Sequence, residues 1–282
     1  MKAIYWIEAT RPKTLFCSLS PILLGTCFAL KTGSFSLLTF LMTLFAALAI
    51  QIGTNFANEY YDFIKGTDTS LRKGPRRLVQ AGLISSSDMR LATFLILSTA
   101  ALFSTYLIAC GGPAFAVLAA VSIFLAVGYT GGPYPLSYLG LGDLFAFLFF
   151  GPIAAGATAY LQTLSISWNA LFLGCSLGLL STATLVVNNL RDIEDDRKAN
   201  KNTLAVRFGK SFSKIEYTAC LVAGCLLPLF FGFYLPLVAL IPAVVPLRSV
   251  WNLTKLNEAL AQTSKIGFLL AALIAASLFY GF

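Results

Sequence analysis

The chain has 282 residues, of which 57% are hydrophobic and only 11% charged, with a formal net charge of +8 and no histidine. Its mean hydropathy of +0.79 excludes an ordinary soluble globular domain, in which about 25% of residues are charged. The composition predicts an all-α, polytopic membrane protein that forms a single domain over residues 1–282.

Nine apolar segments are predicted to cross the membrane, because about 20 apolar residues span the hydrocarbon. They cover residues 14–30, 36–57, 91–110, 113–130, 141–161, 168–190, 217–233, 235–250 and 266–282. If the N-terminus is cytoplasmic, this order places every Lys and Arg except Lys31 on the cytoplasmic side, together with all 12 acidic residues. We therefore expect a nine-helix bundle with a polar cap on its cytoplasmic side. The first segment is expected to remain in the protein, because charged residues precede it and no cleavage site follows.

The net positive charge and the six cysteines do not indicate a further function. The excess of basic residues follows from the topology, and no nucleic-acid partner is expected because no soluble basic domain is present to bind one. The six cysteines lie in or beside apolar segments without the spacing of a metal site, so we expect buried hydrophobic side chains.

Two acidic clusters, residues 58–62 and 192–196, stand where the second and sixth apolar segments end. Residues four apart share one face of a helix, so the first and last members of each cluster converge. Carboxylates packed together repel one another unless a divalent cation neutralises them, and oxygen ligands without His or Cys favour Mg²⁺. The predicted metal ligands are Asn58, Glu59, Asp62, Asp192 and Asp196.

Basic residues follow both acidic clusters, which indicates two related four-helix units and a ninth helix. A third loop on the same side, residues 131–138, contains Gly and Pro but no charge, which predicts a turn and argues against phosphate binding. Metal-binding oxygens, Arg and Lys beside a lipid-facing bundle match a diphosphate on a long apolar tail. Such a site stabilises the leaving diphosphate, and aromatic side chains shield a carbocation from water.

The two clusters resemble the Asn-Asp-x-x-Asp and Asp-x-x-x-Asp motifs that follow the second and sixth helices in the UbiA superfamily of intramembrane prenyltransferases. Glu59 departs from the usual Asp but keeps a carboxylate. The branch that prenylates 1,4-dihydroxy-2-naphthoate is similar to this chain in five ordered strings, residues 58–68, 74–80, 129–133, 150–152 and 188–192. The loop between the fourth and fifth predicted helices lacks the basic residues found in the 4-hydroxybenzoate and haem-O branches, which argues against both.

The resemblance implies Mg²⁺-dependent transfer of a polyprenyl group from polyprenyl diphosphate to 1,4-dihydroxy-2-naphthoate in a bacterial plasma (inner) membrane. CO2 is lost and demethylmenaquinol forms, as a step of menaquinone biosynthesis. Catalysis is implied for Asp62, Asp192 and Asp196. Diphosphate binding is implied for Arg11, Lys65, Arg76, Arg77 and Lys201, and contact with the aromatic acceptor for Tyr129, Asp143 and Asn188.

Simpler interpretations remain open for these residues. The carboxylates could be solvated helix ends, and the basic residues could be topology signals. Arg11 could mark a helix start before Pro12, Asp143 a helix cap and Asp68 an Asx turn. At the level of function, the alternatives are another aromatic acceptor within the superfamily and a transporter or lipid carrier. Transporters hold ionisable residues near the membrane midplane, and the predicted spans carry essentially none.

Overall fold

The computed structural model describes residues 2–67 and 74–281, so the predicted turn at Asp68 lies outside the described residues. All regular structure in these ranges is helical, which confirms the all-α prediction. The first half of the chain forms α1 (Lys2–Ala9), η1 (Pro12–Thr14), α2 (Phe16–Lys31), α3 (Leu37–Ile64), α4 (Ser86–Gly111), α5 (Pro113–Gly128) and α6 (Leu136–Leu139). The second half forms α7 (Gly142–Phe149), α8 (Pro152–Thr163), α9 (Trp168–Arg191), α10 (Ile193–Lys198), α11 (Leu204–Leu226), η2 (Leu227–Phe231), η3 (Leu235–Ala239), α12 (Leu240–Trp251) and α13 (Leu256–Tyr280).

The protein is an integral membrane protein, because 6 of its described helical segments are long and apolar enough to cross a membrane. These segments are Leu37–Ile64, Ser86–Gly111, Gly142–Thr163, Trp168–Arg191, Leu204–Phe231 and Leu256–Tyr280. The pair Ala3–Thr14 and Phe16–Lys31 passes the same test together but is bent by 56°. Pro113–Gly128 and Leu235–Trp251 are apolar but shorter. Each of the nine predicted segments thus overlaps an apolar helical region.

Two helices begin earlier than their apolar residues indicate. The span predicted for residues 217–233 belongs to α11, which begins at Leu204, where the Thr203 hydroxyl accepts a hydrogen bond from the Val206 N–H at 3.3 Å. The span predicted for residues 266–282 belongs to α13, which begins at Leu256. Hydropathy locates only the part of a helix that lies in lipid, so polar first turns were missed.

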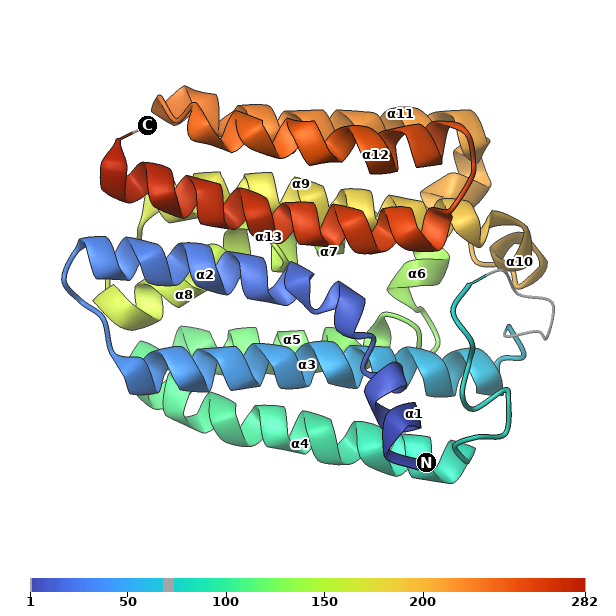
Figure 1. The fold of residues 1–282 in the computed structure, drawn as a ribbon. Helices are drawn as coiled ribbons and strands as arrows, with labels where there is room; N and C mark the ends of the chain where they lie inside the picture. Colours follow the sequence, from blue (N-terminus) through green and yellow to red (C-terminus); the bar gives the residue numbers. More distant parts are fainter. Residues whose placement is uncertain (1, 68–73, 282) are drawn as a thin grey trace.

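The long helices run side by side (Figure 1), with α3 and α4 on one side of the bundle, α11 and α12 on the other, and α9 and α13 between them. The α9 segment is the most enclosed of the candidate spans, with 72% of its apolar window buried. Its Leu173, Leu177 and Leu180 form the main core with Leu221 of α11 and Ile274 of α13. This core holds α9, α11 and α13 together, and the polar connections extend from the ends of these helices.

Close helix approach depends on small residues, as it does in membrane bundles generally. At Gly151, where α7 ends and α8 begins, an added Cβ would lie 2.6 Å from the Phe147 carbonyl oxygen and 2.7 Å from the Gly178 Cα. At Gly178 of α9 an added Cβ would lie 2.4 Å from the same carbonyl oxygen. The Phe150-Gly151-Pro152 string therefore presses the α7–α8 break against α9.

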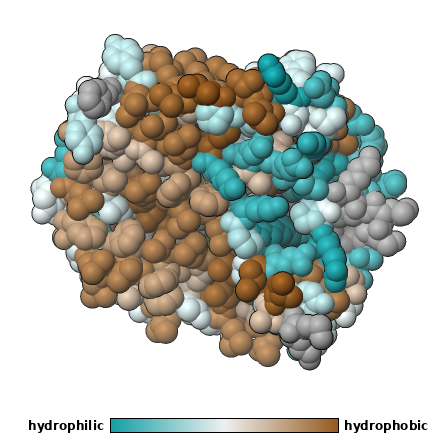
Figure 2. Space-filling view, in the orientation of Figure 1, coloured by the Kyte–Doolittle hydropathy of each residue, from teal (hydrophilic) through white to brown (hydrophobic). Residues whose placement is uncertain are grey.

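The polar connections gather at one end of the bundle. In Figure 1, α1, α6, α10 and the described segment 74–85 before α4 all lie toward the right-hand end, where the N-terminus also lies. Figure 2 shows hydrophilic residues collected toward this end of the visible face, while hydrophobic residues cover most of the rest. The loops that follow the second, fourth and sixth predicted spans thus meet at one end of the molecule.

Candidate active site

The two acidic clusters lie on helix ends that extend beyond the apolar segments. Helix α3 continues to Ile64, so Asn58, Glu59 and Asp62 stand on its final turns. Asp192 is the C-cap residue of α9, and Asp196 lies in α10, where its backbone N–H donates to the Asp192 carbonyl oxygen at 2.8 Å. Both clusters therefore sit on helical backbone at the same end of the bundle.

Asp62 joins the segments that follow the two clusters. Its carboxylate accepts from Arg77 Nη2 at 2.7 Å and from Lys201 Nζ at 2.7 Å, and the residue is only 2% exposed. The backbone N–H of Lys201 in turn donates to the Asp196 carbonyl oxygen at 2.9 Å. The ion pair of Lys201 with Asp62 therefore brings the second acidic cluster to the first.

Glu59 is buried beside Asp62 but serves different partners. Its Oε1 accepts from the backbone N–H groups of Leu78 and Val79, the latter at 3.3 Å. Its Oε2 lies 3.1 Å from Arg77 Nη1 and 3.6 Å from Arg11 Nη2. Glu59 thus fixes the chain at residues 77–79 to the end of α3, which places Arg77 over Asp62.

Arg191 holds Asp192 in a fixed orientation. Arg191 Nε and Nη2 donate to the two carboxylate oxygens of Asp192, each at 2.7 Å. The remaining guanidinium donors reach Asn188 Oδ1 and Asn257 Oδ1, both at 2.8 Å. This two-pronged geometry uses the planar fork of arginine, and Arg191 and Asp192 are both buried.

The uncharged third loop takes part in the site through Thr130. The Thr130 hydroxyl donates to Asn58 Oδ1, and the Thr130 carbonyl oxygen accepts from Lys65 Nζ at 2.6 Å. Asn58 and Lys65 lie on opposite sides of Glu59 and Asp62 in the sequence. Thr130 therefore ties the end of α3 to the Gly-Gly-Pro turn.

Tyr138 of α6 lies beneath two ammonium groups. Lys65 Nζ is 4.6 Å and Lys201 Nζ 5.5 Å from the centroid of its ring, which is within the range of a cation–π contact. Burial of the Lys65 ammonium lowers its pKa below the usual value and the nearby Lys201 acts in the same direction, while Asp62 opposes them. The site thus concentrates positive charge next to its carboxylates.

The two remaining predicted arginines have different positions. Arg11 adopts a left-handed conformation with φ 52° at the bend between α1 and α2, and it reaches both Glu59 and the cavity described next. The turn is secured by Asn55 Nδ2, which donates to the Thr10 carbonyl oxygen at 2.9 Å. Arg76 is exposed and lies 5.7 Å from the ring of Tyr5 on α1. Of this pair, the structure brings only Arg11 to the carboxylates.

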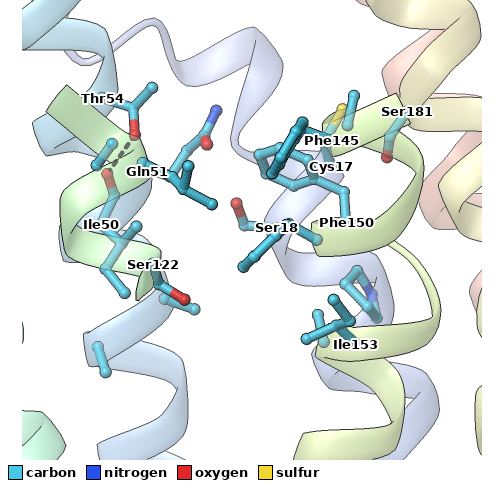
Figure 3. Close-up of a pocket in the computed structure, with 18 of the residues that line it drawn as sticks. Cys17, Ser18, Ile50, Gln51, Thr54, Ser122, Phe145, Phe150, Ile153 and Ser181 are labelled. Atoms are coloured by element: carbon cyan, nitrogen blue, oxygen red, sulfur yellow. Dashed lines mark hydrogen bonds between the residues drawn. The ribbon is translucent and has the colours of Figure 1, made fainter. Parts of the chain in front are cut away.

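A cavity of about 350 Å³ extends from this charged cluster into the bundle. Arg11, Asn58 and Asn188 line its polar end, and Leu107 and Leu161 line the part that lies toward the opposite end of the helices. Most of its wall is apolar. Figure 3 shows the rings of Phe145 and Phe150 on the wall opposite Ile50 and Gln51. An elongated apolar ligand with a charged head matches this shape and polarity.

A family model described as the UbiA prenyltransferase family matches residues 18–279 of the sequence. The chain belongs to this family. The match includes both acidic clusters, Arg77 and Lys201, and most of the residues that line the cavity, while Arg11 precedes it. As a UbiA family member, the protein is a prenyltransferase.

Individual members of the family are similar to this chain over most of their length. The chain is 35% identical to "1,4-dihydroxy-2-naphthoate octaprenyltransferase" from Haemophilus influenzae over 98% of this chain and 96% of that protein. It is 39% identical to the Escherichia coli protein of the same name over 78% of this chain and 73% of that protein. A UbiA homolog from Archaeoglobus fulgidus, solved bound to GPP and Mg²⁺, has the same fold with a TM-score of 0.62 and 17% identity. The superposition covers 97% of this chain and 99% of that one.

Most of the residues expected for a UbiA site lie around one space. Glu59, Asp62, Arg77 and Lys201 form the charged cluster, while Arg11, Asn58, Tyr129 and Asn188 line the cavity. Asp143 does not line it. Asp143 is 6% exposed at the start of α7, and within the described residues its Oδ1 has no hydrogen-bond partner.

Three polar residues of this UbiA site were not identified from the sequence. Thr130 and Tyr138 were not predicted because they belong to a loop without charge. Residues 129–133 were nevertheless one of the strings similar to the naphthoate branch. Gln51 was missed because it lies inside a segment interpreted only as apolar. Helical spacing was the available signal, since Gln51, Asn55 and Asn58 follow one another at intervals of a turn on α3.

The donor atoms around the charged cluster are suited to a hard divalent cation. Asn58, Asp62, Asp192 and Asp196 offer oxygen atoms as metal ligands. Within residues 2–67 and 74–281 the structure shows no preformed group of three or more metal-ligating side chains. Instead, Asp62 and Asp192 are neutralised by Arg77, Lys201 and Arg191. These ion pairs compensate the same negative charge that a metal ion would compensate.

Proposed function

We propose that this prenyltransferase moves a polyprenyl group from polyprenyl diphosphate to 1,4-dihydroxy-2-naphthoate, with loss of CO2 and formation of demethylmenaquinol. The names of the Haemophilus influenzae and Escherichia coli relatives support the acceptor and the place in menaquinone biosynthesis. The observation that carries the proposal is the junction of a buried ionic cluster with a largely apolar, Phe-lined cavity. One end suits a diphosphate, and the other suits an isoprenoid and an aromatic ring.

In this proposal, the diphosphate is held by Arg77, Lys201 and Arg11. Arg77 and Lys201 each donate to Asp62 at 2.7 Å, and Arg11 reaches into the cavity from the bend before α2. On binding, these groups turn part of their hydrogen bonding from carboxylate to phosphate oxygens, which form strong charge-assisted bonds. Lys65 adds a further positive charge at the same end of the cavity.

Mg²⁺ is the metal that the oxygen-only donor set favours, and the Archaeoglobus fulgidus homolog was solved with Mg²⁺ and GPP. Asn58, Asp62, Asp192 and Asp196 would hold it. When bound, the ion supplies charge stabilisation to the leaving diphosphate. Glu59 is assigned a different role here, because its oxygens already accept hydrogen bonds from Arg77, Leu78 and Val79.

The chemistry proceeds without a protein nucleophile. The allylic C–O bond breaks and its electron pair leaves with the diphosphate, while Phe145, Phe149 and Phe150 surround the cationic carbon with aromatic faces and exclude water. The electron-rich naphthoate ring attacks that carbon at the position that bears its carboxylate. The bond to the carboxylate then breaks, its electron pair restores the aromatic ring, and CO2 departs.

The same proposal places the chain in the membrane. We assign it nine transmembrane helices in a single domain, which requires that α5 and the η3–α12 region cross the bilayer despite their shorter length. Because the basic residues gather at the end that carries the acidic clusters, this end faces the cytoplasm, and the membrane is a bacterial inner membrane. Polyprenyl diphosphate then enters with its tail in the bilayer and its head at the cytoplasmic surface.

An acceptor screen tests the proposal. Purified protein in detergent is given a long-chain polyprenyl diphosphate, Mg²⁺ and either 1,4-dihydroxy-2-naphthoate, 4-hydroxybenzoate or homogentisate, and the products are identified by mass spectrometry. The naphthoate is expected to give the prenylated quinol, and the other acceptors little or no product. Preference for another acceptor would overturn the acceptor assignment, and no product from any acceptor would overturn the proposed activity.

A further inference from the structure

Gln51 is a polar side chain placed in the largely apolar part of the cavity. It lies on α3, is 9% exposed, and its amide points into the cavity toward the wall formed by Phe145 and Phe150 (Figure 3). None of the hydrogen bonds found within residues 2–67 and 74–281 involves this amide, and its polar atoms border the cavity rather than being enclosed by protein. These atoms are therefore available to a ligand in the cavity that carries hydrogen-bonding groups.

The two nearest polar residues on α3 are already hydrogen-bonded. The Thr54 hydroxyl donates to the Ile50 carbonyl oxygen at 2.9 Å within its own helix, and the Asn55 amide is used by Thr10. Ser18 of α2 and Ser122 of α5 also line the cavity, and none of the hydrogen bonds found among the described residues involves their side chains. Figure 3 shows the Ser18 hydroxyl directed into the cavity, where the residue is 6% exposed. Gln51 and Ser18 thus present hydrogen-bonding groups from two different helices.

A polyprenyl tail cannot satisfy either group, because it contains no hydrogen-bonding atoms. The missing partner must be flat and apolar enough to pack against Phe145 and Phe150 yet carry oxygen atoms. Gln51 lies two helical turns, about 10 Å along the axis, from Asn58 at the polar end. At that depth an acceptor ring meets the carbon next to a diphosphate bound at the charged cluster.

We propose that Gln51, assisted by Ser18, binds the ring hydroxyl groups of the aromatic acceptor and thereby determines acceptor specificity. The amide both donates and accepts, so it satisfies a phenolic hydroxyl in either direction. A ring without that hydroxyl leaves the amide unpaired, which is the arrangement by which sites reject deoxy analogues most strongly. This inference rests on the proposed function and adds the residue that recognises the acceptor.

A cycle of two enzymes and two acceptors tests the assignment. Gln51→Met keeps nearly the same length and volume but removes both the donor and the acceptor atom. The acceptors are 1,4-dihydroxy-2-naphthoate and 1-hydroxy-2-naphthoate, which lacks the second ring hydroxyl. The quantity compared is kcat/KM for the dihydroxy acceptor divided by kcat/KM for the monohydroxy acceptor. In the parent protein this ratio reflects both the difference in ring reactivity and the hydrogen bond to the second hydroxyl. In Gln51→Met only the difference in reactivity remains, so the ratio is expected to shrink about tenfold.

Further measurements separate recognition from a general effect on packing. The KM for the polyprenyl diphosphate is expected to stay unchanged in Gln51→Met, and equilibrium binding of the dihydroxy acceptor without donor or metal is expected to weaken about tenfold. Thr54→Val is the matched control, because its hydroxyl faces the same cavity but is already bonded to Ile50; it should keep the ratio of the parent. Ser18→Ala should reduce the ratio less than Gln51→Met does.

Two results would overturn the inference. One is an equal loss of kcat/KM for both acceptors in Gln51→Met, and the other is a raised donor KM with unchanged acceptor binding. Failure of the proposed function is distinguishable, because the parent itself would then not prenylate the naphthoate. The cycle would then use the hydroxylated acceptor found in the screen and its deoxy analogue, and an equal loss for both would still refute the role of Gln51.

Discussion

Lys201 Nζ lies 2.7 Å from Asp62 Oδ1, although the two residues are 139 positions apart in the sequence. Lys201 follows the second acidic cluster and Asp62 ends the first, so this contact joins the two halves of the candidate site. Arg77 holds the other carboxylate oxygen at 2.7 Å. The arrangement places two cations beside one carboxylate and compensates its negative charge.

Asp62→Asn is expected to lower kcat/KM by a factor of about 100 or more, because stabilisation of the leaving group is the main catalytic term in such a site. The variant keeps the size of the side chain, so its elution in size-exclusion chromatography should match the parent. Asp88→Asn, an exposed first-turn residue of α4, is the control and should retain full activity. Full activity of Asp62→Asn, or of the parent in EDTA, would contradict the metal assignment.

Glu59 offers a test of stability that is separate from catalysis. Glu59→Gln removes the charge that pairs with Arg77 in a buried setting, which is expected to reduce the free energy of unfolding by about 3 kcal/mol. Glu59→Asp keeps the charge and is expected to retain activity, with a loss of about 1 kcal/mol because the shorter side chain reaches Leu78 and Val79 less well. Thermal unfolding in detergent measures both. Equal stability of Glu59→Gln and the parent would show that the anchoring role is wrong.

Arg191→Lys should raise the Mg²⁺ concentration needed for half-maximal activity by several-fold. Lysine cannot reproduce the two parallel bonds to Asp192, so the carboxylate loses its fixed orientation. A metal titration at saturating substrates measures the change. Arg197→Lys is the matched control, because its side chain is 55% exposed and pairs with Glu194 at the surface. An unchanged metal requirement in Arg191→Lys would exclude this positioning role.

Topology is tested with single cysteines in a background that lacks the native six. Ser87→Cys and Asn200→Cys, both exposed at the polar end, should react with an impermeant maleimide only from the cytoplasmic side. Ser165→Cys, exposed in the connection between α8 and α9, should react only from the opposite side. Labelling of positions 87 and 200 from different sides would be incompatible with a shared site.

The sequence predicted the helices and the two acidic clusters at their ends. It did not predict the direction in which individual side chains of the site point. Scarce carboxylates at helix ends indicated Asp62 and Asp192, and the resemblance to the UbiA superfamily implied a role for Arg77 and Lys201 at the same site. The direction of Glu59 toward the backbone of Leu78 depends on the path of a loop, which periodicity does not contain.

The interior of the bundle shows the same limit. Hydropathy averages over a segment, so it found the helices but not the polar Gln51 that faces the cavity. Asp143 at the start of α7 does not line the cavity, and its contact with the acceptor stays a prediction. Which face of a helix turns inward is decided by packing against distant helices, such as α7 against α9.

The central claim is replacement of the acceptor carboxylate by the prenyl group, and carboxyl-labelled 1,4-dihydroxy-2-naphthoate tests it most directly. The purified protein is incubated with this acceptor, polyprenyl diphosphate and Mg²⁺, and released CO2 and prenylated product are counted together. We expect one labelled CO2 for each molecule of product, and a product without label. A prenylated product that keeps the labelled carboxylate, or label release that does not depend on the diphosphate, would contradict the account.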